Sequence, residues 1–243
     1  MATLFVSDLH LDAARPAITA LFLDFLRNEA THAEALYILG DLFEAWVGDD
    51  EASELATSVR TGLRELHEAG VPVLVMRGNR DFLLGPGFAE QTGARLLADP
   101  CVVSLYGQPT LLMHGDLLCS DDLAYQAFRE QVRSHGWQQR FLAQSLAARH
   151  AFAGQARAAS QQRQDGLREE AELEAITDAN SDTAAETMAR YGVTRLIHGH
   201  THRPAIHSLR CGGHSAQRMV LGDWYHQGSV LRASGDGFEL SAL

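Results

Sequence analysis

Lysine is absent from this sequence of 243 residues, and cysteine is rare. Its 20 basic residues, all arginine, are outnumbered by 31 Asp and Glu, and the net charge of −11 argues against a general nucleic-acid binder. The three cysteines, Cys101, Cys119 and Cys211, form no CxxC pair, which argues against a disulfide framework and a thiolate zinc site. No segment approaches the ~18 continuous apolar residues of a membrane span, and residues 1–8 lack the cationic start of a signal peptide. We therefore expect a protein of the reducing cytoplasm.

Short apolar runs that end in polar residues alternate with helical patterns along the chain. Three strands and two helices are predicted early in the chain, with strands over residues 4–6, 35–39 and 71–76 and helices over residues 17–30 and 53–69. Further strands are predicted over residues 102–106, 110–113, 195–197, 205–209, 217–221, 229–233 and 238–240. The alternation predicts a layered α/β fold, and 46% apolar residues are enough for a full core.

A stretch rich in Ala, Gln and Arg interrupts this alternation at residues 121–180. Its pattern is helical, and we expect a cap inserted into a single domain over residues 1–243. Four apolar side chains follow a period close to 3.6: Trp137, Phe141, Ala148 and Phe152. Residues 123–164 also carry six Arg against one Glu. Two interpretations stay open: an apolar stripe on the core with a solvated basic back, or a surface that meets anionic lipid or substrate.

Seven polar side chains follow strand ends and could share one site: Asp8, His10, Asp41, Asn79, His114, His200 and His202. Ligand sites of open α/β sheets gather at the carboxyl ends of strands, so these groups are expected to converge. Oxygen and imidazole donors without sulfur suit Mn²⁺, Fe or Zn²⁺, and seven donors exceed one coordination sphere. We expect two divalent ions, Mn²⁺ before the others, with the Asp41 carboxylate between them at the ~3.5–4 Å separation of two-metal hydrolases.

Five blocks carry a resemblance to a known family: Asp8-x-His10, Gly40-Asp41-x-x-Glu44, Gly78-Asn79-Arg80-Asp81, His114-Gly115-Asp116 and Gly199-His200-Thr201-His202. They resemble the five blocks of the calcineurin-like metallophosphoesterases. The resemblance implies a four-layer αββα sandwich, here with a helical cap insertion. It implies one metal ion on Asp8, His10, Asp41 and His202. It implies the other on Asp41, Asn79, His114 and His200.

One position departs from the pattern of that superfamily. Arg80 stands where most members have a histidine that protonates the leaving group. Arginine stays protonated at any working pH, so it cannot serve as that acid, but it can grip a phosphoryl oxygen. A substrate that needs no acid has a good leaving group, which favours a phosphoanhydride. In the expected mechanism a water between the ions attacks phosphorus while Asn79, Arg80 and His200 act on the phosphoryl group. The alternative is that Arg80 is structural and another residue donates the proton.

Four longer strings, at residues 40–50, 78–85, 114–122 and 198–204, resemble a narrower family, the lipid A pathway pyrophosphatases of Gram-negative bacteria. That resemblance implies hydrolysis of UDP-2,3-diacylglucosamine to UMP and 2,3-diacylglucosamine 1-phosphate (lipid X), with attack at the UMP-side phosphorus. It also gives the apolar, basic cap a role in contact with this substrate and with anionic lipid on the cytoplasmic face of the inner membrane.

The narrower resemblance also implies residues that contact substrate. Carried over by position, they are Asn79, Arg80, Asp122, Ser160, Gln164, Arg168 and His200. Gln164 replaces the commoner Asn, and an acidic insertion over residues 167–175 shifts the register at Arg168. His198, Asp116 and Glu44 are expected to orient ligands or substrate rather than bind metal.

Three other functions remain as alternatives. A soluble metallophosphoesterase could act on another nucleotide sugar or phosphodiester, and a scaffold could keep the fold without catalysis. The complete donor set argues against a scaffold. The net charge argues against a nucleic-acid phosphodiesterase, and no obligate protein partner is evident.

Overall fold

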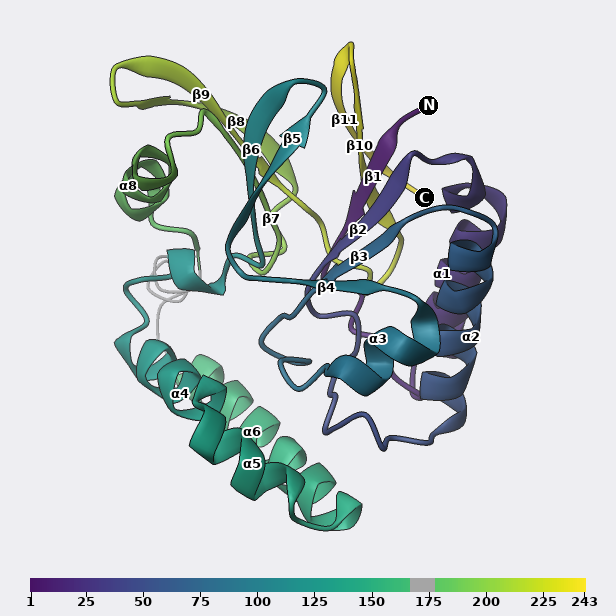
Figure 1. Ribbon diagram of the computed structural model, residues 1–243. Helices are drawn as coiled ribbons and strands as arrows, with labels where there is room; N and C mark the ends of the chain where they lie inside the picture. Colours follow the sequence, from purple (N-terminus) through teal and green to yellow (C-terminus); the bar gives the residue numbers. More distant parts are fainter. Residues whose placement is uncertain (167–177) are drawn as a thin grey trace.

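Two β-sheets pack face to face in the computed structural model, which describes residues 1–166 and 178–243 (Figure 1). The six-stranded sheet has the order β11-β10-β1-β2-β3-β4. Its strands are β1 (Thr3–Val6), β2 (Ala35–Leu39), β3 (Val73–Met76), β4 (Arg95–Leu97), β10 (Ser229–Ser234) and β11 (Gly237–Ala242). The five-stranded sheet has the order β5-β6-β7-β9-β8. Its strands are β5 (Cys101–Leu105), β6 (Gln108–Met113), β7 (Arg195–His198), β8 (Ala205–Cys211) and β9 (His214–Val220).

Helices cover the outer face of each sheet and complete four layers. α1 (Pro16–Asn28), α2 (Glu54–Glu68) and α3 (Pro86–Thr92) pack on the six-stranded sheet, and α8 (Ser181–Tyr191) packs on the other (Figure 1). Two 3₁₀ turns, η1 (Ala30–His32) and η2 (Asp116–Leu118), follow α1 and β6. Phe5, Leu39 and Ile197 belong to the buried apolar layer between the sheets. The predicted αββα sandwich is therefore confirmed.

The parallel strands β1, β2 and β3 all deliver their carboxyl ends to one edge of the fold. β6 and β7 are also parallel and end at the same edge, because His200 after β7 donates its backbone N–H to Asp8 Oδ2 after β1 at 2.9 Å. Sequence patterns located these strands correctly. They missed α3 and β4, which have only seven and three residues and are too short for a clear period. They also missed the longer α8 (Ser181–Tyr191), which directly follows the predicted cap.

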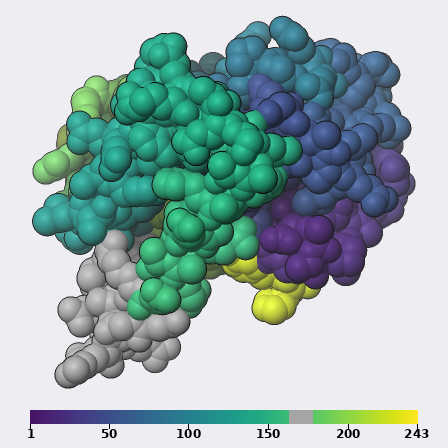
Figure 2. Space-filling view, turned by 90° about the horizontal axis from the view of Figure 1, so that it is seen from below, coloured from purple at the N-terminus to yellow at the C-terminus, as the bar shows by residue number. Residues whose placement is uncertain are grey.

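In the part of the cap that the structure describes there are three helices: α4 (Leu123–Arg133), α5 (His135–Leu142) and α6 (Leu146–Gly166). They lie across the strand-end edge, where the teal-to-green cap meets the blue and purple N-terminal residues (Figure 2). Trp137, Phe141 and Phe152 form one aromatic cluster on the inner side, with ring centroids 4.6–5.6 Å apart. Ala148 is exposed, because the break between α5 and α6 ends the common helical period.

The interpretation that the basic side of the cap faces solvent is wrong for four of its arginines. Each pairs with a carboxylate of the main body: Arg129 with Asp116, Arg133 with Asp116, Arg149 with Asp50, and Arg157 with Glu44. The positive cap is therefore turned toward the acidic body, and these ion pairs attach it there. Within the described residues no helix has the length and apolarity needed to cross a bilayer.

Candidate metal centre and adjoining pocket

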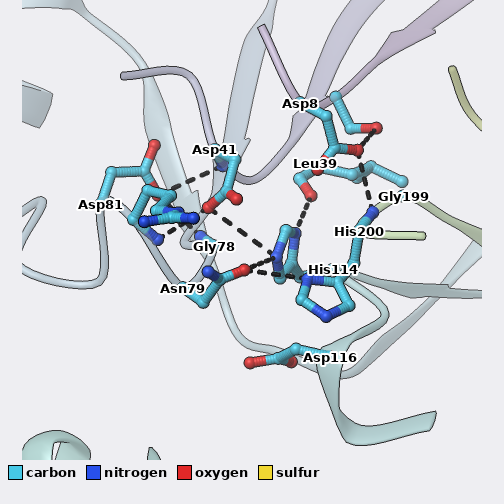
Figure 3. Close-up of polar contacts among 12 residues, drawn as sticks. Asp8, Leu39, Asp41, Gly78, Asn79, Asp81, His114, Asp116, Gly199 and His200 are labelled. Atoms are coloured by element: carbon cyan, nitrogen blue, oxygen red, sulfur yellow. Dashed lines mark hydrogen bonds and ion pairs between the residues drawn. The ribbon is translucent and has the colours of Figure 1, made fainter. Parts of the chain in front are cut away.

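All seven predicted donors lie together at the strand-end edge. They come from the loops after five strands: Asp8 and His10 after β1, Asp41 after β2, Asn79 after β3, His114 after β6, and His200 and His202 after β7. Backbone hydrogen bonds hold neighbouring loops in register, from Asp8 to the Gly40 carbonyl at 3.1 Å and from His10 to the Asp41 carbonyl at 2.9 Å. Figure 3 shows Asp41, Asn79, His114 and His200 directed toward one another.

Backbone strain is concentrated at these donors. Among the described residues six non-glycine residues have a positive φ, and five of them are donors: Asp8 at 54°, His10 at 47°, Asp41 at 54°, His200 at 70° and His202 at 55°. Each such conformation costs about 1–2 kcal/mol for an L-residue. Sharp turns at the strand ends allow successive side chains to point into one site, which explains why the fold retains the strain here.

Asp8, His10 and His202 form one cluster, the Asp8 group, whose donor atoms lie within 4.8 Å of one another. The Nε2 atoms of His10 and His202 are 3.2 Å apart, and the latter lies 3.3 Å from Asp8 Oδ1. Ser7 donates its hydroxyl to Asp8 Oδ2 at 2.5 Å, and this orients the carboxylate. Asp8 Oδ1 is buried without a hydrogen-bond partner. A cation between these atoms would satisfy the orphaned oxygen and both imidazoles, so the residues fit a metal ion.

Asp41, His114 and His200 form a second cluster, the Asp41 group, by the same criterion. Asn79 Oδ1 lies 2.9 Å from His114 Nε2 and 2.9 Å from His200 Nδ1. Asp41 also faces the other cluster, because its Oδ2 is 3.7 Å from His10 Nε2 while its Oδ1 is 3.8 Å from His114 Nε2. The carboxylate of Asp41 thus has one oxygen toward each cluster.

Burial and neighbouring charge set the protonation of the donors. Burial and the adjacent His114 lower the pKa of His200 to about 4, so that imidazole is neutral and able to bind a metal. Burial lowers the pKa of His114, but the carboxylates of Asp41 and Asp116 outweigh it and raise that pKa to about 9. Burial raises the pKa of Asp8, yet its close contact with His202 and the charges of His114 and His10 hold it below its usual value. The carboxylates around His114 favour a positive charge at this position, and a metal ion would supply that charge in place of the proton.

The residues expected to orient ligands lie beside the donors. Glu44 Oε2 is 3.4 Å from His10 Nδ1. Burial raises the pKa of Glu44, but His10 together with the charges of Arg80 and Arg157 outweighs burial and lowers that pKa to about 2. Asp116 is fully buried two residues after His114. His198 is buried with its Nδ1 2.8 Å from the Gly199 carbonyl, and burial lowers its pKa to about 3. His198 belongs to neither donor cluster.

A cavity of about 400 Å³ adjoins the donors and continues under the cap. Asn79, Arg80 and His200 line its polar end, and Phe82, Trp137, Phe141 and Phe152 line its apolar end. Arg80 donates its backbone N–H to Asp41 Oδ1 at 2.8 Å, which attaches this part of the cavity wall to the donors.

The predicted substrate contacts fall partly within this cavity. Asp122 and Ser160 lie in its wall. The side chain of Gln164 and the whole of Arg168 lie outside the described residues.

Comparisons with known proteins agree with this geometry. The family profile described as calcineurin-like phosphoesterase matches residues 1–204. The chain belongs to this family. Proteins named UDP-2,3-diacylglucosamine hydrolase are similar over their whole length: that of Xanthomonas campestris pv. campestris is 59% identical, covering 100% of this chain and 99% of its own, and that of Stenotrophomonas maltophilia is 57% identical with the same coverage. The solved structure of an archaeal phosphodiesterase has the same fold at a TM-score of 0.51 and 12% identity, with all of both chains covered.

Sequence reasoning missed three side chains that support the donors of this phosphoesterase. Asp81 is fully buried and accepts backbone N–H groups of Gly78 and Leu42, both at 2.7 Å, so it joins the loops after β2 and β3. Tyr225 stacks on the His10 ring with centroids 5.1 Å apart, and Tyr125 of α4 stacks on the His200 ring at 6.0 Å. Asp81 could have been found, because it is the last residue of the block Gly78-Asn79-Arg80-Asp81. Nothing local in the sequence indicates the two tyrosines.

Proposed function

We propose that this phosphoesterase hydrolyses the pyrophosphate bond of UDP-2,3-diacylglucosamine and releases UMP and 2,3-diacylglucosamine 1-phosphate. The observation that carries the proposal is the continuity of the donor clusters with an aromatic cavity of about 400 Å³. A substrate that joins a diphosphate to acyl chains needs a polar, metal-binding site for the diphosphate and an adjoining apolar cavity for the acyl chains. The names of the full-length relatives support the same substrate.

Two divalent cations, Mn²⁺ by preference, complete the proposed site. The first is assigned to Asp8, His10, Asp41 and His202. The second is assigned to Asp41, Asn79, His114 and His200. When bound, such ions lower the pKa of water and stabilise charge that develops on phosphoryl oxygens. The buried carboxylates of Asp8 and Asp41, together with imidazole donors such as the neutral His200, support an ion such as Mn²⁺.

Three side chains act on the phosphoryl group in this proposal. Arg80 and His200 stabilise its negative charge from the polar end of the cavity, and Asn79 orients it. Arg80 has no proton to give, so the reaction depends on a leaving phosphate that needs no acid. Glu44, Asp116 and His198 keep the donors oriented. Asp122, Ser160, Gln164 and Arg168 are proposed substrate contacts.

The cap, at about residues 121–180 of a single domain over residues 1–243, is proposed to take the acyl chains from the cytoplasmic face of the inner membrane. Exposed apolar side chains on it support this role, with Leu123 77% exposed and Phe128 39% exposed. Binding to anionic vesicles is expected to weaken in Leu123→Ser, with Ala127→Ser on the same helix as control. Equal vesicle binding by Leu123→Ser and the intact chain would contradict the role. Neither nucleic acid nor an obligate protein partner is part of the proposal.

The test of the reaction is product analysis in ¹⁸O-enriched water with UDP-2,3-diacylglucosamine, UDP-glucosamine and a chromogenic phosphodiester as separate substrates. We expect the diacylated substrate to be strongly preferred and the label to appear in UMP. Label in the sugar phosphate would contradict the assigned direction of attack. Equal turnover of all three substrates would contradict the assigned specificity.

A further inference from the structure

One face of α4 contacts the loops that carry the Asp41 group. This face consists of Tyr125, Gln126, Arg129 and Arg133, which lie within about 100° of each other on the helix. The cap is therefore more than a cover for the acyl cavity, because its first helix contacts the backbone and side chains next to the donors.

Asp116 is the centre of these contacts. Its Oδ2 accepts the Tyr125 hydroxyl at 2.6 Å and the Arg129 Nε–H at 2.7 Å, and its backbone carbonyl accepts the Gln126 amide at 2.8 Å. Asp116 is fully buried and lies two residues after His114. Arginine and tyrosine together offset the burial of this carboxylate, which would otherwise be strongly unfavourable.

Two further contacts support the Asp41 group, one to the loop after β3 and one through Asp99. Arg133 donates to the Gly78 carbonyl at 3.0 Å, directly before Asn79. Arg129 also donates to Asp99 at 3.2 Å, and Asp99 accepts the His114 backbone N–H at 3.2 Å.

The ring of Tyr125 stacks on His200, so the α4 face meets the loops after β3, β6 and β7. By contrast, the loop after β1, which carries Asp8 and His10, receives none of the described contacts of this face.

We infer that Tyr125, Arg129 and Arg133 are positioning residues for the metal ion of the Asp41 group. The inference rests on the proposed two-metal function and goes beyond it, because it makes the affinity of one ion depend on the cap. Loss of a contact that orients a ligand typically weakens metal binding about 10–100-fold. The Asp8 group keeps its own supports, such as Ser7, and so keeps its ion.

The test is Mn²⁺ titration of Arg129→Gln by calorimetry, with electron paramagnetic resonance of the same samples. The intact protein is expected to bind two ions that are magnetically coupled. In Arg129→Gln one ion binds normally, the other binds at least about tenfold more weakly, and the spectrum is that of an isolated ion. Arg140→Gln removes the same charge from an exposed position on α5 and serves as the matched control.

Tyr125→Phe is the second variant, and circular dichroism checks that each variant is folded. It removes only the hydroxyl, so the same ion is expected to bind severalfold more weakly. Arg129→Gln or Tyr125→Phe with two ions at normal affinity, or with both ions weakened equally, would overturn the inference. Intact protein that binds no Mn²⁺ would instead overturn the proposed function.

Discussion

Replacement of Trp137 by alanine tests the cavity as an acyl-chain site. The Trp137 ring packs between Phe141, Phe152 and Phe82, with centroids 4.6, 5.6 and 6.0 Å away, and it lines the apolar end of the cavity. It contacts none of the donors in either metal-binding cluster. The variant should therefore lose binding of the acyl chains and retain the chemistry at phosphorus.

The size of the effect follows from the area that the ring offers to the substrate. A tryptophan buries 150–250 Å², and if half of about 200 Å² contacts acyl chain, the loss is about 2.5 kcal/mol at ~25 cal/mol per Å². Since 1.4 kcal/mol is a factor of ten, kcat/KM for the diacylated substrate is expected to fall roughly 60-fold. Most of this fall should appear as a higher KM.

The assay is UMP release from UDP-2,3-diacylglucosamine in mixed micelles, compared with UDP-glucosamine. Turnover of UDP-glucosamine should be unchanged in Trp137→Ala, because that substrate has no acyl chain. Leu142→Ala, on the same helix but outside the cavity wall, is the matched control. An equal loss with both substrates, or no loss with the diacylated one, would refute the assignment of the cavity.

Three further substitutions test other parts of the site. Asp41→Ala should abolish hydrolysis because both clusters lose a shared donor, and full turnover in this variant would contradict two-metal catalysis. Asp81→Ala leaves buried N–H groups unpaired and should lower the free energy of unfolding by about 3 kcal/mol in urea titration, and an unmoved midpoint would contradict its role. Arg149→Gln should make the cap easier to proteolyse at pH 7. Hydrogen bonding to Arg149 lowers the pKa of Asp50, so the ion pair stabilises above the unfolded pKa of about 3.9 and this part of the effect fades below it. Equal cleavage of both proteins at pH 7 would contradict this attachment.

The convergence of the donors could be predicted because it follows from strand ends. Asp8, Asp41 and Asn79 each follow a short apolar run within three residues, and parallel strands bring such positions to one edge. The Arg80 substitution could also be interpreted from side-chain chemistry alone, since its fixed charge limits what it can do. These conclusions depend on properties that a short window of sequence contains.

The contacts of the cap could not be predicted in the same way. The partners of Arg149 and Arg157 lie about 100 residues earlier in the chain, and a helical pattern does not reveal which carboxylate a basic face will meet. The sequence shows the excess of arginine in the cap. Which way these side chains face depends on the acidic loops against which the cap packs. The strained backbone of His200 and His202 likewise results from tertiary packing rather than from local preference.

The most direct test of the two-metal site is anomalous X-ray diffraction from crystals of the intact protein grown with Mn²⁺. The expected result is two anomalous peaks about 3.5–4 Å apart, one beside Asp8, His10 and His202 and one beside Asp41, His114 and His200. Crystals saturated with Mn²⁺ that show no peak at either cluster would contradict the account.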